Sequence, residues 1–382
     1  GRLRFTTDLP PALEDARAVF IAVGTPPLPD GSADLTFIRQ VAASIGEHLN
    51  GYKVVVTKST VPTGTGQMIE EIVAEKSQGR HPFAVVSNPE FLREGSAIDD
   101  FLHPDRVVVG SRDPRAIETM LDIYAPLRLA NVPFVTTDVE TAEMIKYASN
   151  GFLATKISFI NEMAALCEAY GADVETVARG MGLDTRIGPR FLHPGPGFGG
   201  SCFPKDTRAV SQIAQSRGLT FRIIEAVLDA NDATKQRALD KVLEALGDEP
   251  AGKTVALLGL SFKPDTDDMR ESPALPIIDG LRAAGVHIRA YDPEAIDNTR
   301  EIYPDLHYAR DAYDAADGAD VLAIVTEWNQ FRALSAERLH KLLKQPLIVD
   351  LRNVYEPSKM AAAGFHYISM GRPDGNPDEV QS

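Results

Sequence analysis

Cysteine, tryptophan and long apolar runs are all scarce in this chain of 382 residues. It contains two cysteines and one tryptophan. Two cysteines cannot build a disulfide framework, so we expect a reducing compartment, the cytoplasm. No apolar run approaches the roughly 18 residues of a membrane span, and no signal peptide is recognised. We therefore expect no membrane partner.

Positive charge is also in short supply. The chain has 39 lysines and arginines against 54 aspartates and glutamates, which gives a net charge of −15. This balance argues against a general nucleic-acid partner, although a local basic pocket for a phosphate stays open. The 8 histidines show no paired spacing and no Cys-x-x-Cys occurs, so no metal site is predicted.

The first part of the chain, residues 1–137, has the pattern of an α/β domain. Short β-branched runs alternate with helical patterns, which is typical of βαβ units and a parallel sheet. The expected strands are residues 18–23, 53–57, 83–87, 106–110 and 134–136, and the expected helices are residues 35–49 and 67–76.

Residues 138–250 are expected to form a small helical domain. Residues 139–170 contain no proline and one glycine, and their apolar residues recur at helical spacing. A helix of this length cannot be covered by one small domain. We therefore expect it to link two domains and to bury a face against a partner subunit, in a homodimer or a higher homo-oligomer. A further helix is expected over residues 221–246.

The strand and helix alternation restarts after residue 252, so residues 251–372 are predicted to form a second α/β domain. Its expected strands are residues 254–258, 286–291, 321–325 and 347–350, and its expected helices are residues 274–284, 335–343 and 357–363. Residues 373–382 are polar and are expected to be a disordered tail. The predicted fold is thus α/β, with two Rossmann-like, doubly wound parallel-sheet domains joined by a long central helix and a small helical domain.

The glycine fingerprint of dinucleotide-binding domains, G-x-G-x-x-G, is missing. Gly64 and Gly66 follow an expected strand, but position 69 is isoleucine, so an ordinary strand-to-helix loop is favoured. In the second domain Gly259 ends one strand and Asp292 ends the next, which resembles half of the fingerprint with its ribose-binding acid. Because residues 18–23 already look like an interior strand, we expect the first strands of this domain to lie upstream of residue 1.

One cysteine lies in a segment that favours reactivity, Gly199-Gly200-Ser201-Cys202-Phe203-Pro204-Lys205-Asp206. A glycine pair lets a ligand approach the backbone closely. Pro204 suits the first turn of a helix and Asp206 suits its positive end. Cys202 would then precede a helix start, a placement that favours a nucleophile. A buried structural cysteine in a glycine turn is the alternative. Cys167 falls in the apolar phase of the long helix and is expected in the core.

Six motifs between about residue 15 and residue 372 resemble the UDP-glucose/GDP-mannose dehydrogenase family. They stand in order as Val23-Gly24-Thr25-Pro26, Lys58-Ser59-Thr60-Val61-Pro62, Asn88-Pro89-Glu90-Phe91-Leu92-Arg93-Glu94, Lys146 with Asn150, the Cys202 segment, and Phe262-Lys263-Pro264-Asp265-Thr266-Asp267-Asp268-Met269-Arg270-Glu271-Ser272. The departure is the missing N-terminal strand, GxGxxG turn and helix. The resemblance implies that a primary alcohol at C6 of a nucleotide sugar is oxidised twice to a carboxylate, with NAD as cofactor.

The resemblance also assigns roles in catalysis. Cys202 would trap the aldehyde as a thiohemiacetal, and a thioester would follow and be hydrolysed. Lys146 and Asn150 would donate to the oxyanion at C6; a solvated polar stripe is the alternative. Asp206 would position water or act as a base, with helix capping as the alternative. Glu94 and Thr60 would hold the hydrolytic water.

The remaining assignments concern binding. The resemblance implies that the nucleotide sugar is bound by Glu90, Phe91, Leu92, Phe191, Leu192, His193, Gly195, Gly199, Phe262, Lys263, Arg352 and, from a neighbouring subunit, Arg237. It implies that NAD is bound by Thr25, Pro26, Ser59, Thr60, Glu94 and Arg270. Glu90 and Glu94 could alternatively form a surface ion-pair site for Arg93.

Three readings of the function stay open at this stage. The segment Arg186-Ile187-Gly188 and the Cys202 segment look more like the UDP-glucose branch, which makes UDP-glucuronate from UDP-glucose. A GDP-mannose or other nucleotide-sugar 6-dehydrogenase is the alternative within the family. A catalytically incomplete UDP-sugar-binding fragment is a second alternative. A cysteine hydrolase is disfavoured, because His193 is the only nearby candidate base.

Overall fold

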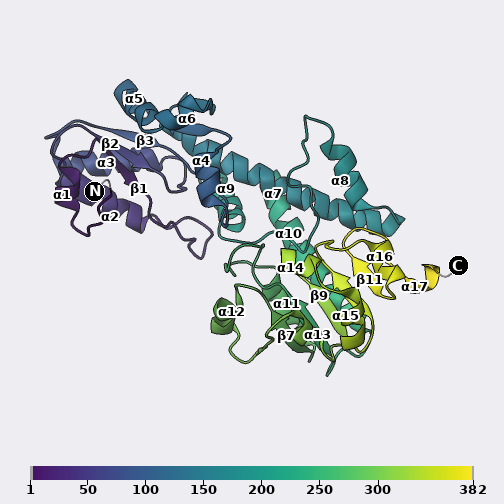
Figure 1. Ribbon diagram of the computed structural model, residues 1–382. Coiled ribbons are helices and arrows are strands. Elements are labelled where there is room, and N and C mark those ends of the chain that lie inside the picture. Colours follow the sequence, from purple (N-terminus) through teal and green to yellow (C-terminus); the bar gives the residue numbers. More distant parts are fainter. Residues whose placement is uncertain (1–2, 381–382) are drawn as a thin grey trace. The chain divides into compact units, whose positions relative to one another are not determined.

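The computed structural model describes residues 3–380 (Figure 1). The chain divides into two compact units. The first comprises Gly1–Gly151 and Lys205–Phe221, and the second comprises Phe152–Pro204 and Arg222–Ser382. Across the described residues, no helix combines the length and the apolar character that crossing a bilayer requires.

The first unit is built on a five-stranded sheet with the order β1-β2-β3-β4-β5. Its strands are β1 (Ala18–Ile21), β2 (Lys53–Thr57), β3 (Phe83–Ser87), β4 (Val107–Gly110) and β5 (Phe134–Thr137). Neighbouring strands are parallel except β3 and β4, which meet in antiparallel fashion at Ser87 and Gly110. The predictions for β2 and β3 are confirmed to the residue, whereas β1 ends two residues before the predicted Val23.

Helices cover both faces of this sheet, which explains why its strand β2 is buried along its whole length. On one face, Val55 and Val85 share a core with residues of the helices α2 (Thr36–Glu47) and α3 (Thr65–Ser77). On the other face, Val54 and Val86 pack with α5 (Pro114–Ile123). Three short helices complete this part of the chain: α1 (Leu9–Leu13), α4 (Ala97–Leu102) and α6 (Ala125–Leu129).

The long predicted helix is confirmed as α7 (Val139–Tyr170), which spans 32 residues. Its residues up to Gly151 belong to the first unit, and those from Phe152 onward belong to the second. Three more helices follow: α8 (Val174–Gly182), α9 (Phe203–Ser216) and α10 (Arg222–Leu246). The α8 helix begins after Asp173, whose side chain accepts a hydrogen bond from the Glu175 amide.

The second unit contains a six-stranded, fully parallel sheet with the order β11-β10-β9-β6-β7-β8. Its strands are β6 (Thr254–Leu258), β7 (His287–Tyr291), β8 (His307–Tyr308), β9 (Val321–Ile324), β10 (Leu347–Asp350) and β11 (His366–Ser369). Its helices are α11 (Ala274–Ala283), α12 (Ile296–Ile302), α13 (Ala312–Ala316), α14 (Asn329–Arg332), α15 (Ala336–Leu342), α16 (Pro357–Ala362) and α17 (Pro377–Val380). This order is doubly wound: the chain first adds β7 and β8 on one side of β6 and then adds β9, β10 and β11 on the other side. The strand order therefore reverses between β6 and β9. Ligands of such sheets bind at the carboxyl ends of the strands at that reversal.

The sequence patterns missed two strands and misjudged the segment after Arg372. The strands β8 and β11 were not predicted, because β8 spans two residues and β11 includes the polar residues His366 and Ser369. Gly375 exchanges backbone hydrogen bonds with Tyr367 in an isolated antiparallel bridge. The expectation of a disordered tail was therefore wrong for residues 373–376. Residues 381 and 382 lie outside the described residues.

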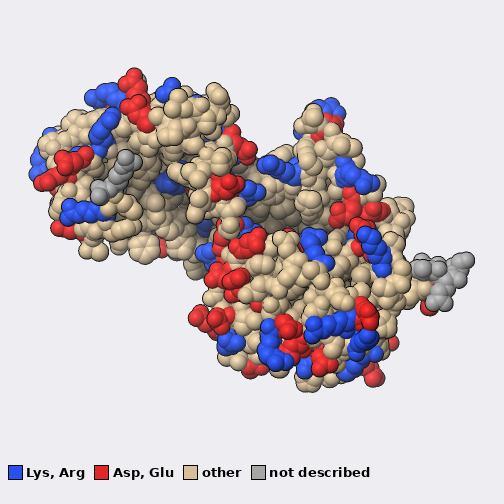
Figure 2. Space-filling model, viewed as in Figure 1, with Lys and Arg blue, Asp and Glu red and all other residues tan. Residues whose placement is uncertain are grey.

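On the face drawn in Figure 2, the described lysines and arginines are interspersed with acidic residues and form no continuous basic stripe. Such a stripe is the usual electrostatic footprint of nucleic-acid binding.

Candidate active site

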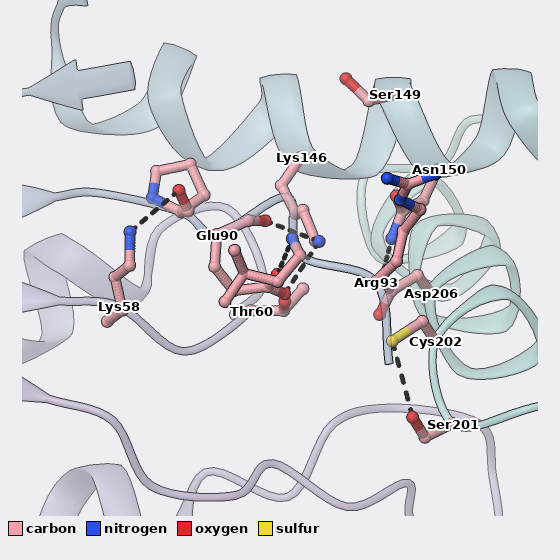
Figure 3. A network of polar contacts seen from close by, with 12 residues as sticks. Lys58, Thr60, Glu90, Arg93, Lys146, Ser149, Asn150, Ser201, Cys202 and Asp206 are labelled. Atoms are coloured by element: carbon pink, nitrogen blue, oxygen red, sulfur yellow. Dashed lines mark hydrogen bonds and ion pairs between the residues drawn. The ribbon is translucent and has the colours of Figure 1, made fainter. Parts of the chain in front are cut away.

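Lys146 projects from α7 toward the loop that follows β3 (Figure 3). The residue is 4% exposed, and its Nζ donates to the backbone oxygen of Glu90 at 2.7 Å. The same Nζ forms an ion pair with Oε1 of Glu90 at 2.9 Å. A buried lysine with a carboxylate partner is not part of a solvated stripe, so that alternative is excluded for Lys146.

Asn150, one helical turn further along α7, binds Asp206. Its Nδ2 donates to Oδ2 of Asp206 at 2.6 Å (Figure 3), and both side chains are buried. Lys205 forms an ion pair with the other carboxylate oxygen of Asp206 at 2.9 Å. Asp206 lies in the first turn of α9, where the helix dipole favours a negative charge. The arrangement gives a buried carboxylate whose position is set from two sides.

Cys202 immediately precedes α9 and is exposed. The helix begins at Phe203, so the helix start predicted from Pro204 is confirmed. The Oγ of Ser201 lies 3.6 Å from the sulfur. Cys167 is buried in a hydrophobic cluster of the second unit, as predicted, and burial raises the pKa of its thiol. Of the two cysteines, Cys202 alone is accessible to a substrate.

Two asparagines that the sequence reasoning missed hold the loop before Cys202. Asn161 of α7 accepts a hydrogen bond from the Gly195 amide at 2.8 Å. Asn231 of α10 accepts from the Phe198 amide at 2.7 Å and donates to the Phe198 oxygen at 3.1 Å. Both asparagines are buried. Because each side chain binds backbone groups, no local sequence signal could have revealed them.

Two glycines of this loop lie so close to neighbouring residues that a side chain would not fit at either position. A Cβ at Gly199 would lie 2.3 Å from the backbone oxygen of Glu271, and one at Gly200 would lie 2.6 Å from the Phe262 ring. The Gly200 amide also donates to the Arg270 oxygen. The loop is therefore packed against the segment after β6, within the second unit.

Arg352 lies at the carboxyl ends of β6 and β9, where the second sheet reverses. Its guanidinium donates to the backbone oxygens of Val325 and Phe262 and pairs with Glu327 at 3.0 Å. A Cβ at Gly195 would lie 2.9 Å from Nη1 of Arg352. The structure thus brings together Arg352, Gly195 and Phe262, three residues predicted to bind substrate.

A cavity of about 970 Å³ opens beside Arg352 within the second unit. Its lining includes His193 and four arginines, Arg179, Arg332, Arg352 and Arg372. Acidic residues, among them Asp173, Glu175 and Glu327, line it as well. Such a cavity has the size of a small-molecule site and can supply cations to an anionic ligand.

The other predicted substrate residues lie in defined places. The Leu92 amide donates to Oε2 of Glu90, and the Phe91 ring lies 5.3 Å from Nζ of Lys146. Leu192 is buried, whereas Phe191 has a positive φ of 64° and its ring contacts Phe203. Nζ of Lys263 lies over the Phe262 ring at 5.4 Å.

Two arginines are engaged within their own chain. Arg237 donates to Glu168 at 3.0 Å and to the Asn161 oxygen at 3.4 Å. Both contacts lie within its own chain, and its assignment to the substrate site of a neighbouring subunit stays a prediction. Arg93 forms an ion pair with Asp100 at 2.6 Å. This partner is an aspartate, not the pair Glu90 and Glu94 that the alternative proposed for Arg93.

Comparison with known proteins decides the family. Models of the UDP-glucose/GDP-mannose dehydrogenase family match residues 1–128 with the NAD binding domain, residues 140–233 with the central domain and residues 256–357 with the UDP binding domain. The chain belongs to the UDP-glucose/GDP-mannose dehydrogenase family.

Individual relatives agree with this membership. A UDP-glucose 6-dehydrogenase of Rhizobium meliloti (strain 1021) is 52% identical over 377 residues, which cover 98% of this chain and 86% of the relative. The UDP-glucose 6-dehydrogenase TuaD of Bacillus subtilis (strain 168) is 49% identical, with 97% and 80% covered. A solved structure of a UDP-glucose dehydrogenase from the archaeon Pyrobaculum islandicum has a TM-score of 0.89 and 40% identity, with 97% and 84% covered.

The family match confirms the prediction of an NAD-dependent oxidoreductase, and the first unit offers residues that fit the cofactor. Thr25 and Ser59 follow β1 and β2 at the carboxyl edge of the sheet, where cofactors of parallel sheets bind. Thr25 Oγ1 donates to the Thr60 oxygen and Ser59 Oγ donates to the Val23 oxygen, so the two loops are tied together. A Cβ at Gly24 would meet no atom within 4 Å, so the backbone there has open space beside it.

The other turns that resembled nucleotide-binding glycine loops are filled by carboxylates of the protein itself. The amides of Gly64 and Gly66 donate to Glu143 at 2.7 and 2.8 Å, so the prediction of an ordinary loop is confirmed. In the second unit, Asp292 is 1% exposed and accepts from the Leu260 amide and from the Trp328 indole. The carboxylate of Asp292 is thus occupied by groups of the protein itself, so its interpretation as a ribose-binding acid was wrong.

The last predicted cofactor residues are exposed. Pro26 follows Thr25, and its oxygen accepts from the Asp34 amide. Glu94 lies in the loop after β3. Arg270 forms a bidentate pair with Asp268, at 2.9 and 2.8 Å. In residues 3–380, no three histidine, cysteine, aspartate or glutamate side chains are grouped in a way that could hold a metal ion.

Proposed function

We propose that the chain oxidises UDP-glucose at C6 to UDP-glucuronate through a covalent intermediate on Cys202. The observation that carries this proposal is the pair of contacts along α7, Lys146 with Glu90 and Asn150 with Asp206, together with the exposed Cys202 at the start of the helix that bears Asp206. These are the residue types that two successive oxidations at one carbon require: hydrogen-bond donors, a carboxylate and a thiol.

The first oxidation removes a hydride and a proton from the C6 alcohol and leaves an aldehyde. NAD, when bound, accepts the hydride in each of the two oxidations. Lys146 and Asn150 donate to the C6 oxygen as its negative charge develops, and they are held for this by Glu90 and Asp206. Because these donors are buried and already oriented, little reorganisation is required during the reaction.

Covalent capture follows. The Cys202 sulfur bonds to the aldehyde carbon, and the carbonyl oxygen takes a proton, which gives a thiohemiacetal. Loss of a second hydride and a second proton gives a thioester. Water then attacks the thioester carbon, the carbon–sulfur bond breaks, and a carboxylate and the free thiol result. Asp206, Glu94 and Thr60 are the groups we assign to this water.

The nucleotide end of the substrate is assigned to the second unit. The cavity beside Arg352 has a volume that suits a nucleotide, and His193 and Pro194 of the loop before Cys202 line it. Lys263 and Phe262 lie on the segment against which that loop packs. The identities of 52% and 49% with relatives named for UDP-glucose favour UDP-glucose over GDP-mannose.

We also propose a homodimer through α7. In the second unit, Phe152, Phe159 and Leu166 recur every seven residues along this helix and are 66%, 47% and 50% exposed. An apolar row of this spacing lies on one side of a helix, and exposed large apolar rows of this kind are typical of subunit contacts. A second copy of this chain would bring an identical row to it.

A stoichiometric assay tests the activity. Purified protein is given NAD and limiting UDP-glucose, and two molecules of NADH are expected for each UDP-glucose consumed, with UDP-glucuronate as the product by mass spectrometry. Faster NADH formation from GDP-mannose would overturn the choice of substrate. Calorimetric binding of UDP-glucose without any NADH formation would favour a binding protein instead.

A further inference from the structure

Lys58 directly follows β2, and its ammonium group donates three hydrogen bonds near the start of the loop that contains Glu90. It is drawn at the left of Figure 3. Its Nζ donates to Oδ1 of Asn88 at 3.1 Å, to the hydroxyl of Tyr124 at 3.4 Å and to the backbone oxygen of Pro89 at 3.5 Å. An ammonium group has three N–H donors, so each of them has an acceptor here.

The partners of Lys58 are themselves fixed. Asn88 is fully buried, and its Nδ2 donates to the Val108 oxygen of β4 at 2.7 Å. Burial raises the pKa of Tyr124 to about 12, so its hydroxyl stays protonated and donates to Oδ1 of Asn88 at 2.7 Å. The strands β3 and β4 pair only at Ser87 and Gly110, in antiparallel fashion. The hydrogen bond from Asn88 to the Val108 oxygen adds a side-chain link between the two strands near this pair.

The turn that Lys58 holds carries Glu90. Two consecutive backbone oxygens each accept from an ammonium group: Pro89 from Lys58 and Glu90 from Lys146. The Glu90 carboxylate then pairs with the same Lys146. Any shift of the turn would move the carboxylate that orients Lys146.

Burying this ammonium has a cost. Burial lowers the pKa of Lys58 to about 8, the Glu90 carboxylate opposes that change, and the Lys146 ammonium reinforces it. Replacing a buried charge and all its partners by apolar groups of the same shape is often nearly neutral for stability, whereas removing one partner alone leaves the others unsatisfied. Stability alone therefore does not require a lysine at this place, and the contacts of Lys58 with the Glu90 turn indicate a further role.

We infer that Lys58 is a positioning residue, which holds the turn Asn88-Pro89-Glu90 so that Glu90 keeps Lys146 oriented toward the reacting carbon. This inference rests on the proposed role of Lys146. It assigns no contact between Lys58 and substrate or cofactor.

The substitution Lys58→Met tests it, because methionine retains most of the side-chain volume without the charge. We expect kcat with UDP-glucose and NAD to fall by about 10- to 100-fold, since small displacements of catalytic groups have effects of this size. The KM for UDP-glucose should rise by a smaller factor than kcat falls, because Glu90, Phe91 and Leu92 serve substrate binding whereas Lys146 serves the transition state. In Lys58→Ala, added ethylamine should restore part of kcat.

The matched control is Lys53→Met at the other end of β2. Lys53 is also buried and donates to a backbone oxygen, that of Glu14, far along the chain from the Glu90 turn. Its loss should leave kcat within about twofold. An equal loss of kcat in both variants, or no loss in Lys58→Met, would overturn the inference.

A second measurement is independent of the proposed activity. Amide hydrogen exchange followed by mass spectrometry should show faster exchange in the peptide that contains residues 88–92 in Lys58→Met and unchanged exchange there in Lys53→Met. If the wild type forms no NADH, the proposed function fails, and the exchange still decides whether Lys58 holds the turn. Unchanged exchange in Lys58→Met would refute the positioning role.

Discussion

Nδ2 of Asn150 lies 2.6 Å from Oδ2 of Asp206, and this contact joins two helices whose contacting residues are 56 positions apart. Both side chains are buried, so the carboxylate has a fixed orientation at the start of α9. We expect Asp206→Asn to lower kcat by about 100-fold or more, because an amide cannot accept a proton from water. The KM for UDP-glucose should change little. Steady-state NADH formation measures both, and a kcat within twofold of the wild type would contradict the assignment of Asp206.

Cys202 is exposed and Cys167 is buried, which gives a direct chemical test. Iodoacetamide should label Cys202 and spare Cys167 in the folded protein, and saturating UDP-glucose should slow the labelling. Cys202→Ser should abolish full turnover and leave UDP-glucose binding nearly intact by calorimetry. Ser201→Ala is the control and should keep most of the activity. Normal glucuronate output from Cys202→Ser would refute a covalent intermediate.

Asn231 satisfies both backbone groups of Phe198. In Asn231→Ala, a buried N–H and a buried C=O lose their partners, which costs about 1–3 kcal/mol for each group left unsatisfied. We expect a lower free energy of unfolding in urea and a higher KM for UDP-glucose, since the loop would lose its shape. Gln236→Ala, on the exposed side of the same helix, should match the wild type in both measurements. If Asn231→Ala keeps the wild-type KM, the prediction that Asn231 supports substrate binding through this loop is wrong.

Glu143 makes the stability of the fold depend on pH. Burial raises its pKa to about 7, although the Gly64 and Gly66 amides favour the charged form. The folded protein therefore holds this proton up to higher pH than the unfolded chain, whose glutamate ionises near 4.5. Its contribution to stability is fully present below pH 4.5 and is lost as the pH rises through 7.

Unfolding in urea at several pH values between 4.5 and 8 measures this contribution. The difference in unfolding free energy between the wild type and Glu143→Gln should become less favourable to the wild type as the pH rises. A difference that is independent of pH would show that Glu143 does not titrate in this range.

The row of Phe152, Phe159 and Leu166 gives a test of the dimer. A lysine at position 159 would place a charge in an apolar contact, where its desolvation is not compensated. We expect Phe159→Lys to shift the mass measured by light scattering toward the monomer. Ile98→Lys is the control, because Ile98 is an 80% exposed apolar residue of α4 and lies outside the row. A wild-type protein that is already monomeric would contradict the proposal.

Elements with a strong local pattern could be predicted from the sequence. The strands β2, β3 and β10 were predicted to the residue, and the helix α7 was predicted with an approximate end near Tyr170. A run of 32 residues with helical periodicity, or a buried strand between polar ends, determines its own structure. Two glycines and a helix start favoured a nucleophilic Cys202, but these local features left a buried structural cysteine open, and the structure shows Cys202 exposed. The strands β8 and β11 escaped prediction because their pairing partners, rather than their own residues, define them.

The partners of the side chains in the candidate site were decided by the tertiary structure alone. The contacts of Lys146 with Glu90, of Asn161 with Gly195 and of Asn231 with Phe198 join residues 33 to 56 positions apart. Hydrogen bonds between such distant residues depend on how sheets and helices pack, and no local pattern encodes them. The same holds for Glu143 and Asp292, whose carboxylates fill glycine turns that the sequence alone could not distinguish from nucleotide-binding loops.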